Sequence, residues 1–191
     1  MEEIFVDRTL YNGAPEDLDG RCAVERETYA FLKGKGVSFQ RVDHGPAMTI
    51  AACEEVDRVL GIHMCKNLFL CNRQKTDFYL LLMPGRKPFR TKELSSQIQA
   101  ARLSFADETY MREFLGLEPG SVTVLGLIHD ADRRVRLLID EDLLKDEYIG
   151  CHPCINTSSL KIRMKDLLET ILPATGHTYT PVHLSDGQVS E

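Results

Sequence analysis

The chain has 191 residues, 43% of them hydrophobic and 27% charged, a composition that fits one folded domain and excludes a disordered chain. Its 29 acidic and 23 basic residues give a net charge of −6, which excludes a protein that coats nucleic acid without specificity, although a local basic face is still allowed. No apolar run is long enough to cross a membrane, and the acidic N-terminus does not resemble a secretory signal. We therefore expect a soluble, cytoplasmic protein with neither a membrane nor DNA as a partner.

Apolar spacing and turn-forming residues predict short helices mixed with short strands. Helices are predicted where apolar residues recur every three or four positions before a glycine or proline. Strands are predicted where short apolar runs are joined by polar turns. In chain order, the predicted elements are a helix over 22–33, an extended segment over 37–43, a helix from a cap at Thr49 to Leu60, a hairpin of 67–71 with 78–83, a helix from a cap at Asp107 to Leu115, a second hairpin of 122–127 with 135–140, a strand over 158–162, and a helix over 165–172 that Pro173 stops.

Two hairpins among scattered helices favour the α+β class, with a mixed or mostly antiparallel sheet that could close into a barrel. No repeat, low-complexity tract or linker interrupts the chain. We expect a single domain over residues 1–184, followed by a polar C-terminal tail over 185–191.

Motifs of several common enzyme classes are missing from the sequence. It has no glycine-rich phosphate loop, dinucleotide fingerprint, HExxH or GxSxG. Six cysteines are too sparse for a disulfide scaffold. Cys151 and Cys154 have the spacing of half a zinc site, but no second pair completes it, so buried reduced thiols are the simpler interpretation. Cys65 or Cys151 as a nucleophile is a further alternative, although no paired base can be identified.

Lys66 and Asn67 open an otherwise apolar predicted strand. A lysine in this place can neutralise a phosphate or hold a carboxylate, and an asparagine can orient a carbonyl or hydroxyl group. The alternative is a surface lysine at a strand end.

Gly150 and His152 lie in a segment of small and polar residues, which we predict to be a rigid loop. A glycine lets a ligand approach the main chain, and a main-chain amide can donate to a developing oxyanion. His152, next to Pro153, could donate a hydrogen bond or position water; the alternative is a turn whose histidine is internally satisfied.

Two further features could bind anions. The segment from His44 to Thr49 ends at a predicted helix N-terminus, where free amides could meet an anionic or carbonyl group; the alternative is a plain helix cap. Basic runs at 86–92, 133–136 and 161–163 could form one phosphate-binding patch if folding joins them, or they could be separate solvated faces.

Taken in order, these segments resemble the superfamily that contains YbaK and the editing insertion domain of bacterial prolyl-tRNA synthetase. The resemblance is strongest to its free-standing prolyl-tRNA editing proteins, of the ProXp-ala or PrdX type. It implies a compact, mixed, mostly antiparallel β-barrel flanked by helices. The two cysteines around His152 and Pro153 depart from the motif, in which aliphatic residues are usual. The resemblance runs from residue 22 to residue 184 and is carried by 42–49, 66–70, 105–122, 126–128, 150–157 and 165–168.

The resemblance also implies an activity, the hydrolysis in trans of the ester of alanine mischarged onto proline tRNA. A synthetase pocket made for proline excludes the smaller alanine only weakly, so a second pocket that rejects proline by size completes a double sieve. The resemblance implies no metal, cofactor or side-chain nucleophile, and it implies that the ribose 2′-hydroxyl of the substrate assists. The implied partners are tRNA(Pro), through its 3′ end and acceptor stem, and transiently prolyl-tRNA synthetase.

Roles for individual residues follow from the same resemblance. Lys66 would hold the terminal adenosine phosphate and the ester, with support from Asn67. The main chain at Gly150 would bind the scissile carbonyl. His152 would place the aminoacyl group or water. Substrate contacts are implied for His44, Met48, Thr49, Asn156 and Thr157.

Three alternatives stay open. The chain could deacylate cysteine or another small amino acid on the same tRNA with the same fold. It could be a non-catalytic module that binds tRNA or a synthetase. It could also be a metal-binding protein that uses its cysteines.

Overall fold

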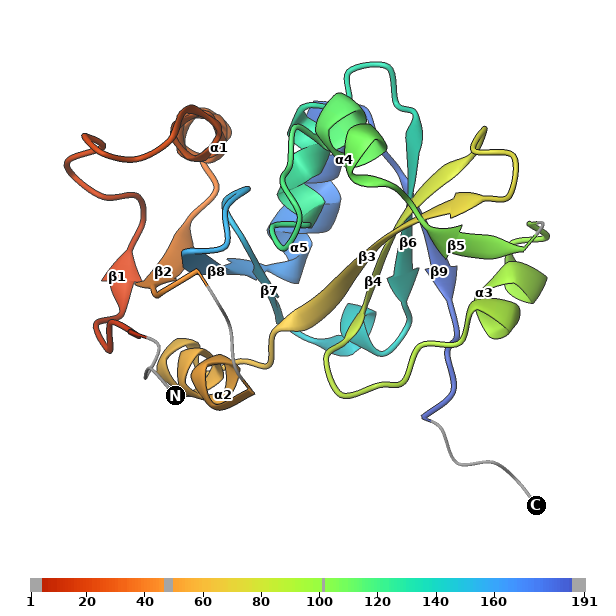
Figure 1. Ribbon diagram of the computed structural model, residues 1–191. Coiled ribbons are helices and arrows are strands. Elements are labelled where there is room, and N and C mark those ends of the chain that lie inside the picture. Colours follow the sequence, from red (N-terminus) through yellow and green to blue (C-terminus); the bar gives the residue numbers. More distant parts are fainter. Residues whose placement is uncertain (1–4, 47–49, 101, 187–191) are drawn as a thin grey trace.

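The computed structural model describes residues 5–46, 50–100 and 102–186, and its strands form two sheets (Figure 1). The four-stranded sheet is antiparallel, in the order β1–β2–β8–β7, and the five-stranded sheet has the order β5–β3–β4–β6–β9, in which β6 runs parallel to both β4 and β9. The first sheet consists of β1 (Tyr11–Asn12), β2 (Phe39–Asp43), β8 (Ser158–Arg163) and β7 (Tyr148–Cys151). The second consists of β5 (Leu103–Phe105), β3 (Cys65–Asn72), β4 (Phe78–Pro84), β6 (Val135–Asp140) and β9 (Tyr179–Val182).

Short helices flank the two sheets (Figure 1). Within the described ranges, no helix is long and apolar enough to cross a membrane. The α-helices are α1 (Ala23–Gly34), α2 (Ile50–Leu60), α3 (Thr91–Gln97), α4 (Glu108–Leu115), α5 (Met164–Asp166) and α6 (Leu172–Thr175). Two 3-10 helices, η1 (Val124–Ile128) and η2 (Leu143–Lys145), and a π-helical turn, η3 (Leu167–Ile171), complete the set.

The largest hydrophobic cluster lies between the two sheets, because it takes side chains such as Leu160 from one and Leu80 from the other. A second cluster lies on the opposite face of the five-stranded sheet, where Leu94 of α3 and Leu184 cover it. β4 is buried on both faces, and this explains why its sequence is a continuous apolar run instead of an alternating one.

Most of the local predictions are confirmed. The first predicted hairpin exists as β3 and β4, and the predicted helices before Gly34, Gly61 and Gly116 exist as α1, α2 and α4. Gly116 adopts a left-handed conformation with φ of 63°, so it ends α4 as a glycine at this position commonly does.

The second predicted hairpin is wrong. Residues 122–127 resemble a strand, but most of this run forms η1, whose start is capped when the Leu125 amide donates to the Thr123 hydroxyl. A Cβ atom on Gly126 would lie 2.8 Å from Leu117, so η1 packs tightly on the turn that follows α4. β6 pairs instead with β4 and β9, which are distant in sequence, and apolar runs alone do not reveal parallel pairing.

The predicted helix over 165–172 does not stop at Pro173. It continues as α5, η3 and α6 and ends at Gly176, whose φ is 72°. Pro173 lies in the first turn of α6, where a proline is tolerated.

The α+β class and the mixed, mostly antiparallel pairing are confirmed, but closure into a barrel is not. Among the described residues, the two sheets are joined at an isolated bridge between Met64, just before β3, and Gly150 of β7. Elements as short as α3, β5, β7 and β9 have too few residues for a periodic pattern to reveal them. In the predicted tail, the main-chain amide of Ser185 donates a 2.8 Å hydrogen bond to the Glu93 carboxylate. Residues 187–191 of the tail lie outside the described residues.

Candidate active site

β7 and the start of β3 come into close contact at Gly150. The Cys65 thiol donates to the carbonyl oxygen of Gly150 at 3.2 Å. A Cβ atom added to Gly150 would lie 2.3 Å from the sulfur of Met64 and 3.2 Å from its Cα atom. Gly150 therefore lies within a strand, paired with Lys161 of β8, and not in the loop that its sequence context predicts. Its lack of a side chain lets the two sheets touch.

His152 follows directly after β7 and is fixed on both sides. Its main-chain oxygen accepts from the Thr123 hydroxyl at 2.9 Å, and its Nδ1 lies 2.9 Å from the carbonyl oxygen of Ser158. Because a carbonyl oxygen can only accept, Nδ1 carries the proton and Nε2 presents a lone pair. Burial lowers the pKa of His152 and outweighs the hydrogen bond to Ser158, so the ring is neutral at pH 7. The result is an oriented, uncharged hydrogen-bond acceptor.

His44 lies beside His152, with ring centroids 6.2 Å apart in an edge-to-face arrangement. Its Nδ1 is 3.0 Å from the Gly45 carbonyl oxygen, and its Nε2 is 2.9 Å from the Ser159 hydroxyl. Both ring nitrogens are thus used within the protein, and burial lowers the pKa of His44. His44 braces the site more than it offers a free group to a substrate.

Asn156 and Thr157 fasten the loop after β7 to the chain just before residues 47–49. The Asn156 amide donates to the Pro46 carbonyl oxygen at 3.1 Å, and the Thr157 carbonyl oxygen accepts from the His44 amide at 2.9 Å. Met48 and Thr49, the other two predicted substrate contacts, lie outside the described residues. The structure therefore brings His44, Asn156 and Thr157 together with His152.

Lys66 lies on a different face of β3 from the residues that contact β7. Side chains alternate along the strand, so that Phe69 faces the core between the sheets and Leu68 faces the opposite side, which Lys66 shares. Its Nζ atom donates to the main-chain oxygen of Lys87 at 2.8 Å. Lys66 thus lies at the margin of the site, held by the segment that follows β4.

Asn67 faces the Gly150 side of β3. Its Nδ2 atom lies 3.4 Å from the carbonyl oxygen of Cys65, and its Oδ1 atom is buried without a hydrogen-bond partner among the described residues. An unpaired buried acceptor costs free energy unless a ligand or water satisfies it. Among the predicted site residues, Asn67 is therefore the one whose buried side-chain oxygen lacks a hydrogen-bond donor in the described structure.

The cysteines support neither a metal centre nor a thiol nucleophile. Within the described ranges, no three His, Cys, Asp or Glu side chains are placed to share a metal ion. Burial raises the pKa of Cys65 and that of Cys154 to about 12 and raises the pKa of Cys151 well above the usual value. Buried protonated thiols are poor nucleophiles, which favours the interpretation as reduced core cysteines.

The three basic runs do not form one patch. Lys87 contacts Asp140 at the end of β6, so residues 133–136 lie at the other end of that strand, and 161–163 belong to the other sheet. Arg136 instead pairs with Asp77 at 3.3 Å.

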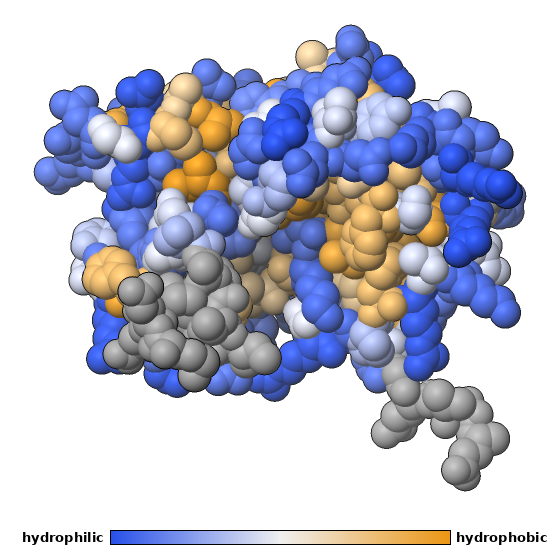
Figure 2. All heavy atoms as spheres, viewed as in Figure 1, coloured by the Kyte–Doolittle hydropathy of each residue, from blue (hydrophilic) through white to orange (hydrophobic). Residues whose placement is uncertain are grey.

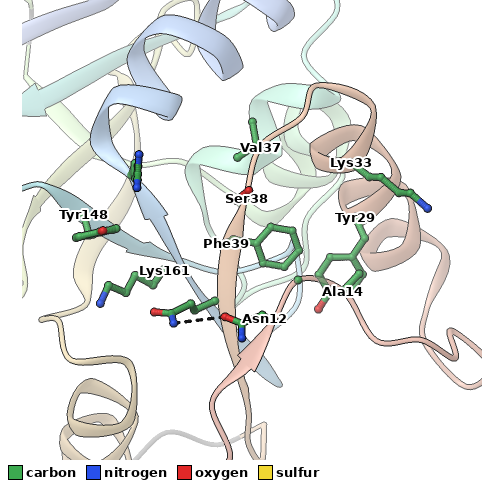
Figure 3. Close-up of a pocket in the computed structure, with 12 residues that line it drawn as sticks. Asn12, Ala14, Tyr29, Lys33, Val37, Ser38, Phe39, Tyr148 and Lys161 are labelled. Carbon is green, nitrogen blue, oxygen red and sulfur yellow. Dashed lines mark hydrogen bonds between the residues drawn. The ribbon is translucent and has the colours of Figure 1, made fainter.

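A cleft of about 620 Å³ opens elsewhere, around β2 (Figure 3). Tyr29, Lys33 and Phe39 lie on one side of the strand, and Tyr148 and Lys161 lie on the other. None of the predicted site residues lines it, so the cleft is separate from the His152 site.

Sequence reasoning missed the groups that hold the site together, which are Thr123, the Ser158 carbonyl and Met64. The Thr123 hydroxyl accepts a hydrogen bond from the His152 amide at 3.2 Å and donates one to the His152 carbonyl oxygen. A threonine inside an apolar run was the available signal, because the hydroxyl of such a residue needs a partner once the run is buried.

Comparison with known proteins assigns the family. Residues 44–170 match the aminoacyl-tRNA editing domain, and this range includes all the predicted site residues. The chain is 28% identical over 168 residues to the prolyl-tRNA editing protein ProX of Acetoanaerobium sticklandii, covering 88% of this chain and 99% of that protein. It is 32% identical over 175 residues to the prolyl-tRNA synthetase associated domain-containing protein 1 of Danio rerio, covering 90% and 89% of the two chains.

A solved structure supports the fold. A candidate trans-editing enzyme for prolyl-tRNA synthetase superposes with a TM-score of 0.61 at 17% identity, covering 86% of this chain and 99% of that chain. The resemblance predicted from the sequence is confirmed, and with it the class of aminoacyl-tRNA hydrolases. The chain belongs to the aminoacyl-tRNA editing domain family.

Proposed function

We propose that the protein is a trans-editing deacylase that hydrolyses the ester of alanine mischarged onto tRNA(Pro). The observation that carries the proposal is the neutral His152, whose Nδ1 is fixed by Ser158 and whose Nε2 is thereby an acceptor. An ester bond to ribose is already reactive, so a site needs to orient it and stabilise charge more than supply a nucleophile. The proposal requires no metal or cofactor.

The residues would divide this work. The lone pair of His152 Nε2 would accept a proton from the attacking hydroxyl, whether of water or of the substrate ribose, or from the alanine ammonium group. Main-chain amides of the loop that follows β7 would stabilise the negative charge that develops on the carbonyl oxygen, since Gly150 is paired within the sheet and the His152 amide donates to Thr123. The unpaired Oδ1 of Asn67 would accept from a substrate hydroxyl or amine.

Lys66 would neutralise the phosphate of the terminal adenosine. Its bond to the Lys87 carbonyl leaves two of its three ammonium protons for an anion. Its position at the edge of the site suits contact with the backbone of the RNA more than with the ester itself.

Size would set the specificity. The loop at 152–157 is tied to Pro46 by Asn156 and to His44 by Thr157, so these two segments are held at a fixed separation. Rejection of proline by a rigid wall would complement a synthetase that excludes alanine weakly.

Single-turnover deacylation of alanyl-, cysteinyl- and prolyl-tRNA(Pro) tests the proposal, with wild type compared against Lys66→Ala, Asn67→Ala and His152→Ala. We expect alanine to be released fastest and each variant to lose about 100-fold or more. Lys165→Ala, an exposed residue of α5, serves as the matched control.

Each other result would point elsewhere. Preferential release of cysteine would move the protein to a deacylase of another small amino acid, with the same site. Survival of all three esters, together with measurable tRNA binding, would favour a non-catalytic module.

A further inference from the structure

An exposed aromatic pair lies on the same face of the five-stranded sheet as Lys66. Phe105 of β5 pairs with Leu70 of β3, and Leu70 shares the face of Leu68 and Lys66. Phe105 is 62% exposed, and the half-buried Phe89 lies edge to face with it, at a centroid distance of 6.3 Å. Figure 2 shows hydrophobic surface over this side of the sheet, bordered by hydrophilic residues.

Basic residues adjoin the aromatic pair in the chain. Arg90 and Lys92 follow Phe89, and Arg102 precedes β5. All three are exposed, and none forms an ion pair with any described residue. Arg86 instead lines a pocket with Glu54 and Asp57 of α2. The adjacent acid Glu93 is engaged with Ser185. In a protein with a net charge of −6, this is a concentration of unpaired positive charge around two aromatic rings.

The aromatic pair is continuous with Lys66, at the margin of the candidate site. The Lys87 carbonyl that holds Lys66 is two residues from Phe89. Along β3, four residues separate Lys66 from Leu70, the partner of Phe105, a distance of about 13 Å. At ~3.4 Å per stacked nucleotide, a few unpaired nucleotides span this distance.

We propose that Phe89 and Phe105, with Arg90, Lys92 and Arg102, form a platform on which the unpaired nucleotides at the 3′ end of an RNA stack. The proposal rests on the function proposed above and assigns the place of the RNA strand that leads to the ester. Aromatic side chains stack on any base that is free of its helix, and cations beside them follow the phosphates. Aromatic rings interleaved with arginines match this ligand better than an apolar peptide, which would leave the three cations unpaired.

Binding of a fluorescent single-stranded ribonucleotide, ACCA, to the full chain tests the platform without requiring activity. By fluorescence anisotropy, we expect Phe105→Ala to weaken binding about 5- to 100-fold, and Phe105→Trp to retain it. Arg90→Gln should lower the slope of log affinity against log salt by about 0.7.

Two matched controls should bind as wild type does: Tyr179→Ala, an exposed aromatic on the far edge strand of the same sheet, and Lys165→Gln. A wild type that does not bind ACCA would overturn the proposal. So would a Phe105→Ala variant with wild-type affinity, or equal affinity for a blunt RNA hairpin. Loss of self-association in Phe105→Ala with unchanged RNA binding would identify the surface as a contact between copies instead.

A second assay separates the platform from the deacylase proposal. With alanyl-tRNA(Pro) below saturation, Phe105→Ala should deacylate more slowly than wild type, by the same factor by which its affinity for ACCA falls. With alanyl-adenosine, which lacks the upstream nucleotides, the variant and the wild type should deacylate at equal rates. Equal rates on the tRNA would reject the platform and leave the deacylase standing, whereas ACCA binding by a wild type that hydrolyses no ester would reject only the deacylase.

Discussion

The ammonium group of Lys66 donates a 2.8 Å hydrogen bond to the main-chain oxygen of Lys87, a residue whose own side chain is buried. The Lys87 ammonium lies 2.9–3.0 Å from both oxygens of Asp140, which is also buried, and 2.7 Å from Asp142. Burial lowers the pKa of Lys87, but the bonds to Asp142 and Asp140 outweigh it, so the net shift is upward and the group is charged. A buried ion pair therefore anchors the carbonyl that holds Lys66.

Replacing Lys87 by methionine should destabilise the protein by about 3–5 kcal/mol, because Asp140 would be left buried with an unpaired charge. The double variant Lys87→Met/Asp140→Leu, which removes both charges, should recover much of that loss. Urea unfolding measures both. Lys145→Met, which removes an exposed partner of Asp142, is the control and should leave stability almost unchanged. Equal stability of the single and double variants would contradict the anchoring role of this pair.

Local features of the fold could be predicted from the sequence, and long-range ones could not. The β3–β4 hairpin and the glycine-terminated helices depend on neighbouring residues, so their patterns are visible in short windows. Of the site, Lys66, Asn67, Gly150 and His152 could be selected as candidates from their residue types.

Their arrangement depends on contacts across the chain. His44 meets Ser159 across 115 positions, and Lys66 meets Lys87 across 21. Alternation along a strand places Lys66 and Asn67 on opposite faces of β3, but no pattern in the sequence indicates which of the two faces meets β7, since this depends on the register of β3 against its neighbours.

Stability should fall as the pH drops below about 6.5. Burial is the main cause that lowers the pKa of both His44 and His152 from the ordinary value of 6.5. Below pH 6.5, the unfolded chain therefore binds more protons than the folded chain. The free energy of unfolding therefore rises with pH up to about 6.5 and loses this dependence above it. Urea unfolding at pH 5.0, 6.0 and 7.5 measures the slope.

The His152→Gln variant should lose part of this pH dependence, whereas His183→Gln, which replaces an exposed histidine, should keep it. An unchanged slope in His152→Gln would show that the ring titrates alike in the folded and unfolded states. A loss of deacylation as the pH falls through the pKa of the folded His152 ring, which burial lowers from 6.5, would connect the neutral ring to activity.

Gly150→Ala should separate the two sheets at their point of contact. The new Cβ would lie 2.3 Å from the Met64 sulfur, which can rotate away, but also 3.2 Å from the Met64 Cα atom, which cannot. We expect a loss of about 1–3 kcal/mol in stability and a loss of deacylation, since His152 follows two residues later.

Gly34→Ala is the matched control. At Gly34 an added Cβ meets nothing within 4 Å, so stability should stay equal or rise slightly. Thermal unfolding compares the two variants. Wild-type stability and activity in Gly150→Ala would show that the main chain shifts freely and that close contact between β7 and Met64 is not required.

Alkylation should distinguish structural thiols from reactive ones. Cys22 is exposed, whereas Cys151 and Cys154 are buried, with pKa values that burial raises. Because the thiolate is the reacting form, iodoacetamide at pH 8 should label Cys22 in the native protein and leave Cys151 and Cys154 unmodified. Peptide mass spectrometry identifies the labelled positions, and the denatured protein, in which all six cysteines should react, is the control.

Rapid labelling of Cys151 in the native protein, with loss of deacylation in proportion, would restore the thiol as a candidate nucleophile. Unchanged deacylation after labelling of Cys22 would leave catalysis to His152 and the main chain of the loop that follows β7.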